Sequence, residues 1–221
     1  MSAKPDAARP KAFIEAYDRL LNRLGNDAAV VFAGAVHPAH QARLAGCRVP
    51  EGENIAVAPN SGRQRLNIHG AINPETGATQ MLEVPAAGAQ STILLLKAIL
   101  AAYPALLMIH VHLDNARYHH ARMVREWLAG EGARITLHFI PPPDRVRGRL
   151  YSPHLNPIER LWAAMHRNVT HNRCHATFRE FKAKAMTFLT REVPQFHETG
   201  AIRVTRSPTT SASSTLRNFG F

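Results

Sequence analysis

The chain has 221 residues, 45% of them apolar, which is enough for one domain with its own hydrophobic core. Lysine and arginine number 27 against 16 acidic residues, and the formal charge of +11 favours a nucleic-acid partner over plain solubility charge. The two cysteines, Cys47 and Cys174, have no paired spacing, which is typical of a reduced cytoplasmic protein. The polar N-terminus shows no signal peptide, and charged residues, proline and histidines interrupt the apolar stretch 93–113, so we expect no membrane span.

Hydrophobic periodicity predicts alternating helices and strands along most of the chain. The predicted helices are residues 11–24, 89–102, 117–129, 157–170 and 176–191. The predicted strands are residues 28–34, 65–72, 78–84, 106–113 and 134–140. The turn cluster at 73–77 makes the second and third strands a hairpin. This order of elements predicts an α/β fold with a mixed sheet flanked by helices.

Two acidic residues are predicted where regular structure meets a loop. Asp114 follows the apolar run LLMIHVHL, so a strand delivers its carboxylate to the sheet edge where open α/β sheets place their chemistry. Glu159 falls in the first helical turn, behind the expected N-cap Asn156 and Pro157. Both also have a purely structural interpretation, since Asp114 can cap the next helix and Glu159 can complete a capping box.

The amino-acid sequences of the segments around Asp114 and Glu159 also resemble those of a known family. LDNARYHHA and SPHLNPIERLW resemble the second and third acidic motifs of the DDE transposases, most closely the mariner-type bacterial insertion-sequence transposases with a DDE superfamily endonuclease domain. The resemblance runs from about Arg9 to Arg203, and the segment 152–162 is its most specific part. It implies a ribonuclease H-like fold and two divalent metals, Mg²⁺ or Mn²⁺, held by three carboxylates that cut and join DNA at transposon ends.

The resemblance assigns catalytic, metal-binding roles to Asp114 and Glu159, supported by Asn115 and Asn156. The family's first carboxylate lies in a segment like VVFADAVHP, whereas this chain reads VVFAGAVHP, with Gly34 in its place. A single base change can turn an Asp codon into a Gly codon. Two-metal chemistry needs closely spaced hard oxygen ligands, and glycine offers none. We therefore expect a degenerate domain that does not cleave DNA at a useful rate.

An insert also departs from the family pattern. The family runs from a Pro-Pro pair almost directly into YSPHLNPIE, whereas residues 143–150 intervene here. Such an insert costs little loop entropy, and we expect a mobile, exposed segment that is dispensable for folding. Its Arg145, Arg147 and Arg149 either contact DNA phosphates or are merely solvated.

The resemblance also bears on domain organisation. Residues 1–10 form a polar extension, too short for the helix-turn-helix domains with which such transposases read transposon ends. We expect residues 11–203 to form the catalytic-type domain, binding DNA weakly and without sequence preference in the bacterial cytoplasm and nucleoid. A full-length transposase or a second copy of the chain is a further expected partner.

The Ser/Thr-rich tail 204–221 is predicted to be disordered. The family usually ends with something like RDSVTDNFRVIDPPQFRV. When the tail is back-translated into possible codons and the reading frame is shifted, some of these codons encode this family ending. We therefore expect a frameshift at about Arg203, and the nucleotides of the gene test that expectation.

Two other functions stay open. The first is a non-catalytic module that binds DNA or a transposase through its basic surface. The second is a zinc-dependent hydrolase that uses His110 and His112, which share one strand face and form His-x-His-x-Asp with Asp114. No further ligand cluster in the sequence completes a zinc site.

The other ring side chains nearby have ordinary structural interpretations. His119 and His120 follow Asp114, and we expect both in solvent. Trp127 and Trp162 have helical core spacing, and we expect both to pack against the sheet.

Overall fold

A five-stranded mixed sheet forms the centre of the protein, in the order β3-β2-β1-β4-β5. The computed structural model describes residues 8–43, 62–141, 145–146, 149–150 and 156–198. The strands are β1 (Ala28–Val36), β2 (Ile68–Ile72), β3 (Thr79–Glu83), β4 (Met108–Leu113) and β5 (Ile135–Phe139). Strands β1, β2 and β3 pair antiparallel, while β4 runs parallel to β1 and β5 runs parallel to β4. The predicted hairpin and all five predicted strands are therefore confirmed.

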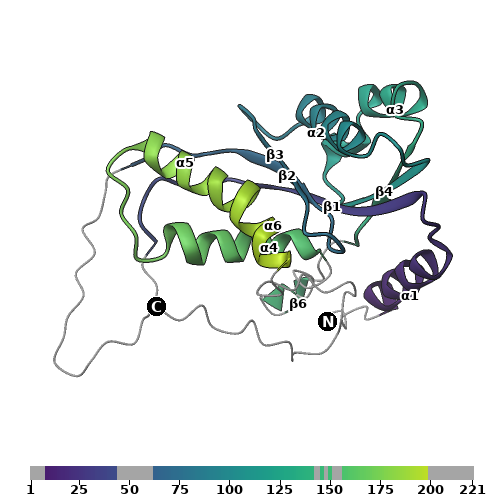
Figure 1. Cartoon of the computed structure of the whole chain (residues 1–221), viewed down its shortest axis with the longest axis horizontal. Helices are drawn as coiled ribbons and strands as arrows, with labels where there is room; N and C mark the ends of the chain where they lie inside the picture. Colours follow the sequence, from purple (N-terminus) through teal and green to yellow (C-terminus); the bar gives the residue numbers. More distant parts are fainter. Residues whose placement is uncertain (1–7, 44–61, 142–144, 147–148, 151–155, 199–221) are drawn as a thin grey trace.

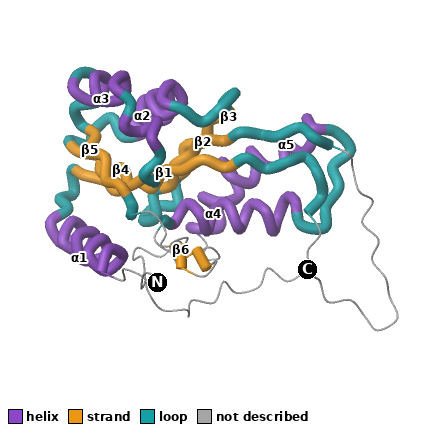
Figure 2. Tube along the Cα trace, turned by 180° about the vertical axis from the view of Figure 1, so that it is seen from behind, coloured by secondary structure: helices purple, strands orange, loops and turns teal. Residues whose placement is uncertain are grey.

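Helices cover both faces of the sheet (Figures 1 and 2). One face carries α2 (Ala89–Ala102) and α3 (Arg122–Ala129), and the other carries α1 (Ala8–Arg23), α4 (Pro157–Met165), α5 (Phe178–Thr187) and α6 (Val193–Glu198). A π-helical turn, His166–Thr170, extends α4, and another, Phe188–Glu192, joins α5 to α6. The helix predicted over 117–129 is broken, because the extended Ala121 separates a 3₁₀ turn, Arg117–His120, from α3.

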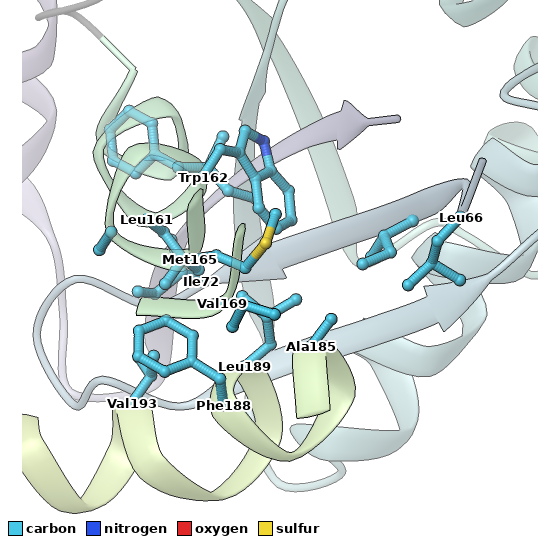
Figure 3. Close-up of a cluster of buried hydrophobic side chains, with 14 of the residues drawn as sticks. Leu66, Ile72, Leu161, Trp162, Met165, Val169, Ala185, Phe188, Leu189 and Val193 are labelled. Carbon is cyan, nitrogen blue, oxygen red and sulfur yellow. The ribbon is translucent and has the colours of Figure 1, made fainter. Parts of the chain in front are cut away.

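Strand β1 lies between two hydrophobic clusters. Val30 and Phe32 face the cluster under α4, and Val31 and Ala33 face the cluster under α2, as the two-residue period of a strand requires. Figure 3 shows the first cluster, with Trp162 of α4 packed among side chains from the sheet and the last helices. Each large side chain buried in this way contributes about 1.5–3 kcal/mol. The packing role predicted for Trp162 is therefore confirmed; Trp127 packs against the other cluster.

Part of the predicted insert forms a short hairpin instead of an open loop. Strand β6 (Arg145–Val146) pairs antiparallel with β7 (Arg149–Leu150). Arg147, the side chains of Arg145 and Arg149, and the tail from residue 199 onward lie outside the described part, so the predictions for them stay predictions. Within the described residues, no helix is both long enough and apolar enough to cross a membrane.

Candidate metal site

Position 34 and Asp114 lie on neighbouring strands at the same edge of the sheet. Strands β1 and β4 pair in parallel with Phe32 opposite His112, so the register, continued by two residues, brings Gly34 opposite Asp114. One strand period separates the two pairs, and position 34 therefore shares with Phe32 the face that α4 covers. Strand β4 ends at Leu113, so Asp114 is the first residue beyond it, as the sequence predicts.

Helix α4 begins with the predicted cap. The Oδ1 atom of Asn156 accepts the Ile158 N–H at 3.3 Å, which satisfies one free donor of the first turn. Its Nδ2 atom donates to the Ala33 carbonyl at 3.4 Å and so ties the start of α4 to β1. Glu159 consequently lies in the first helical turn, where the helix dipole favours a negative charge.

The two carboxylates interact electrostatically, and their pKa values move in opposite directions. Desolvation by the neighbouring protein, followed by the charge of Asp114, raises the pKa of Glu159, although the side chain still reaches solvent. The pKa of Asp114 is lowered, first by its contact with His119 and then by the Ala116 backbone N–H, which lies 3.1 Å from Oδ1. Asp114 is thus held as an anion by the protein, whereas the ionised form of Glu159 has a cost that a bound cation offsets.

The ring beside Asp114 is buried, so the expectation that His119 lies in solvent was wrong. His119 is 2% exposed, and its Nε2 atom lies 3.2 Å from Asp114 Oδ1. Its Nδ1 atom lies 3.2 Å from Thr92 Oγ1, whose hydroxyl donates to the Gly88 carbonyl at 2.9 Å. Because that hydroxyl proton is used, Nδ1 is the donor to Thr92, and the ring is fixed between α2 and the Asp114 carboxylate. From the 3₁₀ turn, the His119 ring thus reaches Thr92 of α2.

Asn115 has a different partner from the one predicted. Its Oδ1 atom accepts from His120 Nε2 at 2.6 Å, and His120 is exposed, as expected. Asn115 makes no contact with Asp114 or Glu159 in the described hydrogen bonds, so its supporting role stays a prediction. Asn156, in contrast, holds the turn that carries Glu159.

The predicted pair His110 and His112 does not converge on a metal. The buried ring of His112 stacks on Phe32 at 4.9 Å and on His138 at 4.6 Å between ring centroids. Burial, with His138 and His110 nearby, lowers the pKa of His112 to about 3, so it packs as a neutral aromatic ring. The described residues contain no group of three or more His, Cys, Asp or Glu side chains placed to hold a metal ion. Within these residues the zinc interpretation finds no support, and no third carboxylate joins Asp114 and Glu159.

Comparison with known proteins identifies the family. The sequence profile of the DDE superfamily endonucleases matches residues 29–182, which include Gly34, Asp114 and Glu159. The chain belongs to the DDE superfamily endonuclease family. It is 26% identical over 148 residues to the insertion element IS630 uncharacterized 39 kDa protein of Shigella sonnei, an alignment that spans 67% of this chain and 38% of that protein.

Solved structures of the mariner transposase Mos1 share the fold of this DDE-family domain. The catalytic domain of Mos1 superposes with a TM-score of 0.55 at 15% identity, over 90% of both chains. The Mos1 paired end complex with Mn superposes with a TM-score of 0.61 at 18% identity, over 90% of this chain and 60% of that chain. The predicted ribonuclease H-like fold and the predicted family are therefore both confirmed.

In this DDE-family domain, two N–H donors lie near position 34. A Cβ atom built at Gly34 would lie 3.6 Å from Trp162 Nε1 and 3.9 Å from Asn156 Nδ2. The Trp162 indole N–H, whose nitrogen is blue in Figure 3, is buried and has no hydrogen-bond partner in the described structure. Such a donor costs about 1–3 kcal/mol. The nearest atom to the added Cβ is Ile158 Cγ2 at 2.9 Å, so an aspartate at position 34 requires that methyl to shift.

Proposed function

We propose that this DDE-family domain derives from a transposase that cuts and joins DNA, and that its chemistry is lost in the present sequence. The observation that supports the proposal lies at position 34. The β1–β4 register, continued by two residues, brings Gly34 opposite Asp114, and the buried Trp162 Nε1 atom lies 3.6 Å from a Cβ atom built at Gly34 and has no described partner. These surroundings support the proposal that an ancestor of this domain carried a carboxylate at position 34.

Asp114 and Glu159 are the residues that would hold a divalent cation, Mg²⁺ or Mn²⁺. Carboxylate oxygens suit both ions, and the Mos1 complexes were solved with Mg and with Mn. Such ions activate the attacking oxygen and stabilise the leaving oxygen in phosphoryl transfer. In this chain, His119 keeps Asp114 ionised, and the Asn156 cap fixes the turn that carries Glu159. The donor set fits one loosely held cation and is one carboxylate short of a two-metal site.

DNA is the proposed partner. The charge of +11 supplies phosphate contacts that do not depend on base sequence, so we expect affinity that falls steeply with salt. A second copy of the chain or a full-length transposase remains a proposed protein partner. If no cleavage can be recovered by substitution, the non-catalytic DNA-binding module is the function that this surface supports.

The test is nicking of supercoiled plasmid DNA in Mg²⁺ or Mn²⁺, with Mn²⁺ affinity measured in parallel. Gly34→Asp should bind Mn²⁺ more tightly and nick at least ~10²-fold faster than the present chain, because electrostatic elements of this kind are worth about 10²–10³-fold. Gly34→Asn is the matched control, since it has nearly the same shape and no charge. Each variant is repeated with Ile158→Leu, which removes the methyl group that crowds position 34.

Two results contradict the proposal. In the first, Gly34→Asp gains neither Mn²⁺ affinity nor nicking in either background. In the second, the glycine form nicks as fast as the aspartate form and Asp114→Ala leaves that nicking unchanged. The second result places any cleavage outside the three-carboxylate assignment.

A further inference from the structure

Basic side chains gather at the end of α4 that lies away from Glu159. The Arg43 backbone pairs with the turn that follows α4, donating to Thr170 O at 3.0 Å and accepting from Asn172 N at 2.9 Å. This pairing places Arg43 beside His171, whose ring lies 6.5 Å from that of His166 and is tilted from it by 20°. Figure 1 shows the end of α4 next to the chain that leaves β1. We refer to Arg43, His166, Arg167 and His171 as the basic cluster.

The cluster is ordered by its own hydrogen bonds. His166 Nδ1 lies 3.0 Å from Thr170 Oγ1, and the Thr170 hydroxyl donates to the His166 carbonyl at 3.0 Å. The hydroxyl proton is therefore used, so Nδ1 carries the ring proton and donates to Thr170. The Nε2 atom of His166 is left without a hydrogen-bond partner in the described part of the chain. The turn that carries His166 therefore fixes the position of this ring beside Arg167 and His171.

No carboxylate offsets these charges in the described structure. Arg43 and Arg167 are both exposed, and none of the ion pairs between described residues involves either of them. The charge of Arg43 acts on both rings, since it lowers the pKa of His166 and of His171 beyond the effect of burial. The lowered pKa values leave the two imidazole rings uncharged near neutral pH, so the charge that attracts an anion comes from Arg43 and Arg167.

The exposed side of α4 links the cluster to the candidate metal site. Glu159, Ala163 and Arg167 are exposed at four-residue spacing, while the other side of the helix, including Trp162, is buried in the core. Arg167 follows Glu159 by eight residues, or about 12 Å at about 1.5 Å per residue. That length equals between three and four base-pair steps of about 3.4 Å each. The only exposed side chain between them on this line is the small Ala163, so an extended polymer can contact both ends.

We propose that the basic cluster binds the phosphodiester backbone of DNA three to four base pairs from the phosphate that faces Asp114 and Glu159. The inference rests on the proposed function, because it takes DNA as the partner. A polymer fits better than a free phosphate, because Arg167 lies on the exposed side of the helix that carries Glu159, and Arg43 pairs with the turn after that helix. The planar guanidinium groups of Arg43 and Arg167 suit bidentate contacts to phosphate oxygens.

The test measures binding of a fluorescent DNA duplex of arbitrary sequence to the full chain. Fluorescence anisotropy gives the binding constant K at each of several salt concentrations. Arg43→Gln combined with Arg167→Gln should lower the slope of log K against log salt by about 2, since each phosphate contact contributes about 0.9. The matched control is Arg19→Gln with Arg23→Gln, which removes two exposed arginines from α1. We expect the control to change the slope by less than half as much. Thermal melts of all three proteins show whether each is folded, and Arg167→Glu should weaken binding further than Arg167→Gln.

The outcomes separate the two proposals. If the wild-type chain binds DNA and both double variants change the slope equally, the cluster contributes only net charge and the inference is wrong, while the proposed function stands. If the wild-type chain binds no DNA at any salt concentration, the inference and the DNA partner are both wrong. If only the cluster variant loses slope, the cluster is the phosphate contact.

Discussion

The end of β4 and the start of α4 hold their carboxylates in opposite ways. Asp114 is 59% exposed, yet His119 and the Ala116 N–H bind its Oδ1 atom, and its pKa is lowered. Glu159 has no hydrogen-bond partner among the described residues, and burial together with Asp114 raises its pKa. The protein itself organises the first carboxylate, whereas the second is held only by the helix that carries it. In the proposed cation site, the protein therefore positions one of the two ligands by hydrogen bonds and leaves the other without them.

The largest expected effect is the loss of plasmid nicking when either carboxylate is removed. The loss should be equal for Asp114, at the end of β4, and Glu159, at the start of α4. In the Gly34→Asp background, Asp114→Asn and Glu159→Gln should each reduce plasmid nicking by ~10²–10³-fold, because each removes a charged ligand and leaves the shape. The measurement is the initial nicking rate in Mn²⁺. If one variant keeps full activity, that carboxylate does not hold the metal, and the comparison between the two ends loses its functional meaning.

The β4 end should make the protein acid-sensitive through His69. Burial first, and then His119, lower the pKa of His69 to about 4, and its Nε2 atom is buried without a described partner. In the unfolded chain His69 takes up a proton near pH 6.5, and in the folded chain it does not. The contribution of His69 to stability therefore falls with falling pH between about 6.5 and 4, by about 1.4 kcal/mol per pH unit. Above pH 6.5 this contribution is constant.

His69→Met removes this titration and leaves Ser91 paired with Gly88. The difference in the free energy of unfolding, variant minus wild type, should be about 2 kcal/mol larger at pH 5 than at pH 8, because the variant no longer loses stability to this titration. Urea denaturation at the two pH values measures the difference. A variant whose stability has the same pH dependence as the wild type would show that His69 is protonated in the folded state.

The stability of the protein should depend on Asn156, which caps α4, and should depend little on Asn115, the asparagine that follows β4. Asn156→Ala should lower the free energy of unfolding by about 1 kcal/mol or more, because it removes the bond to Ile158 N and the bond to Ala33 O. Asn115→Ala, at an exposed position with one contact to His120, should stay within about 0.5 kcal/mol. Equal losses at the two asparagines would contradict the assignment of Asn156 as the residue that anchors α4.

The smallest expected effect concerns the two carboxylates without metal. At pH 7, Asp114→Asn should destabilise the protein by less than about 1 kcal/mol, because it removes an exposed ion pair. Glu159→Gln should destabilise it less, because the folded protein disfavours the charge that this change removes.

Stability from Asp114 is present above its unfolded pKa and is lost as the pH falls through its lowered folded pKa. The cost from Glu159 appears as the pH rises above its unfolded pKa. Melting temperatures at pH 7 that rank the two variants the other way would reverse the comparison.

Much of the architecture can be predicted from local pattern. The predicted helix over 89–102 matches α2 at both ends, and the cap at Asn156 and the strand end before Asp114 are as predicted. These features depend on neighbours within a few residues, which periodicity and turn residues report directly. The absence of a ligand at Gly34 is likewise a property of the sequence, since no fold supplies a carboxylate to glycine.

What required the tertiary structure depends on residues far apart in the chain. The burial of His119 against Thr92, the stacking of His112 between Phe32 and His138, and the pairing of Arg43 with the turn after α4 all join separate elements. The sequence predicted solvent for the first, left zinc open for the second and was silent on the third. Periodicity states which face of an element is apolar but not which residue of another element meets that face. That choice is made by the strand register and the packing of the helices, and those same contacts place an unpartnered Trp162 N–H opposite Gly34.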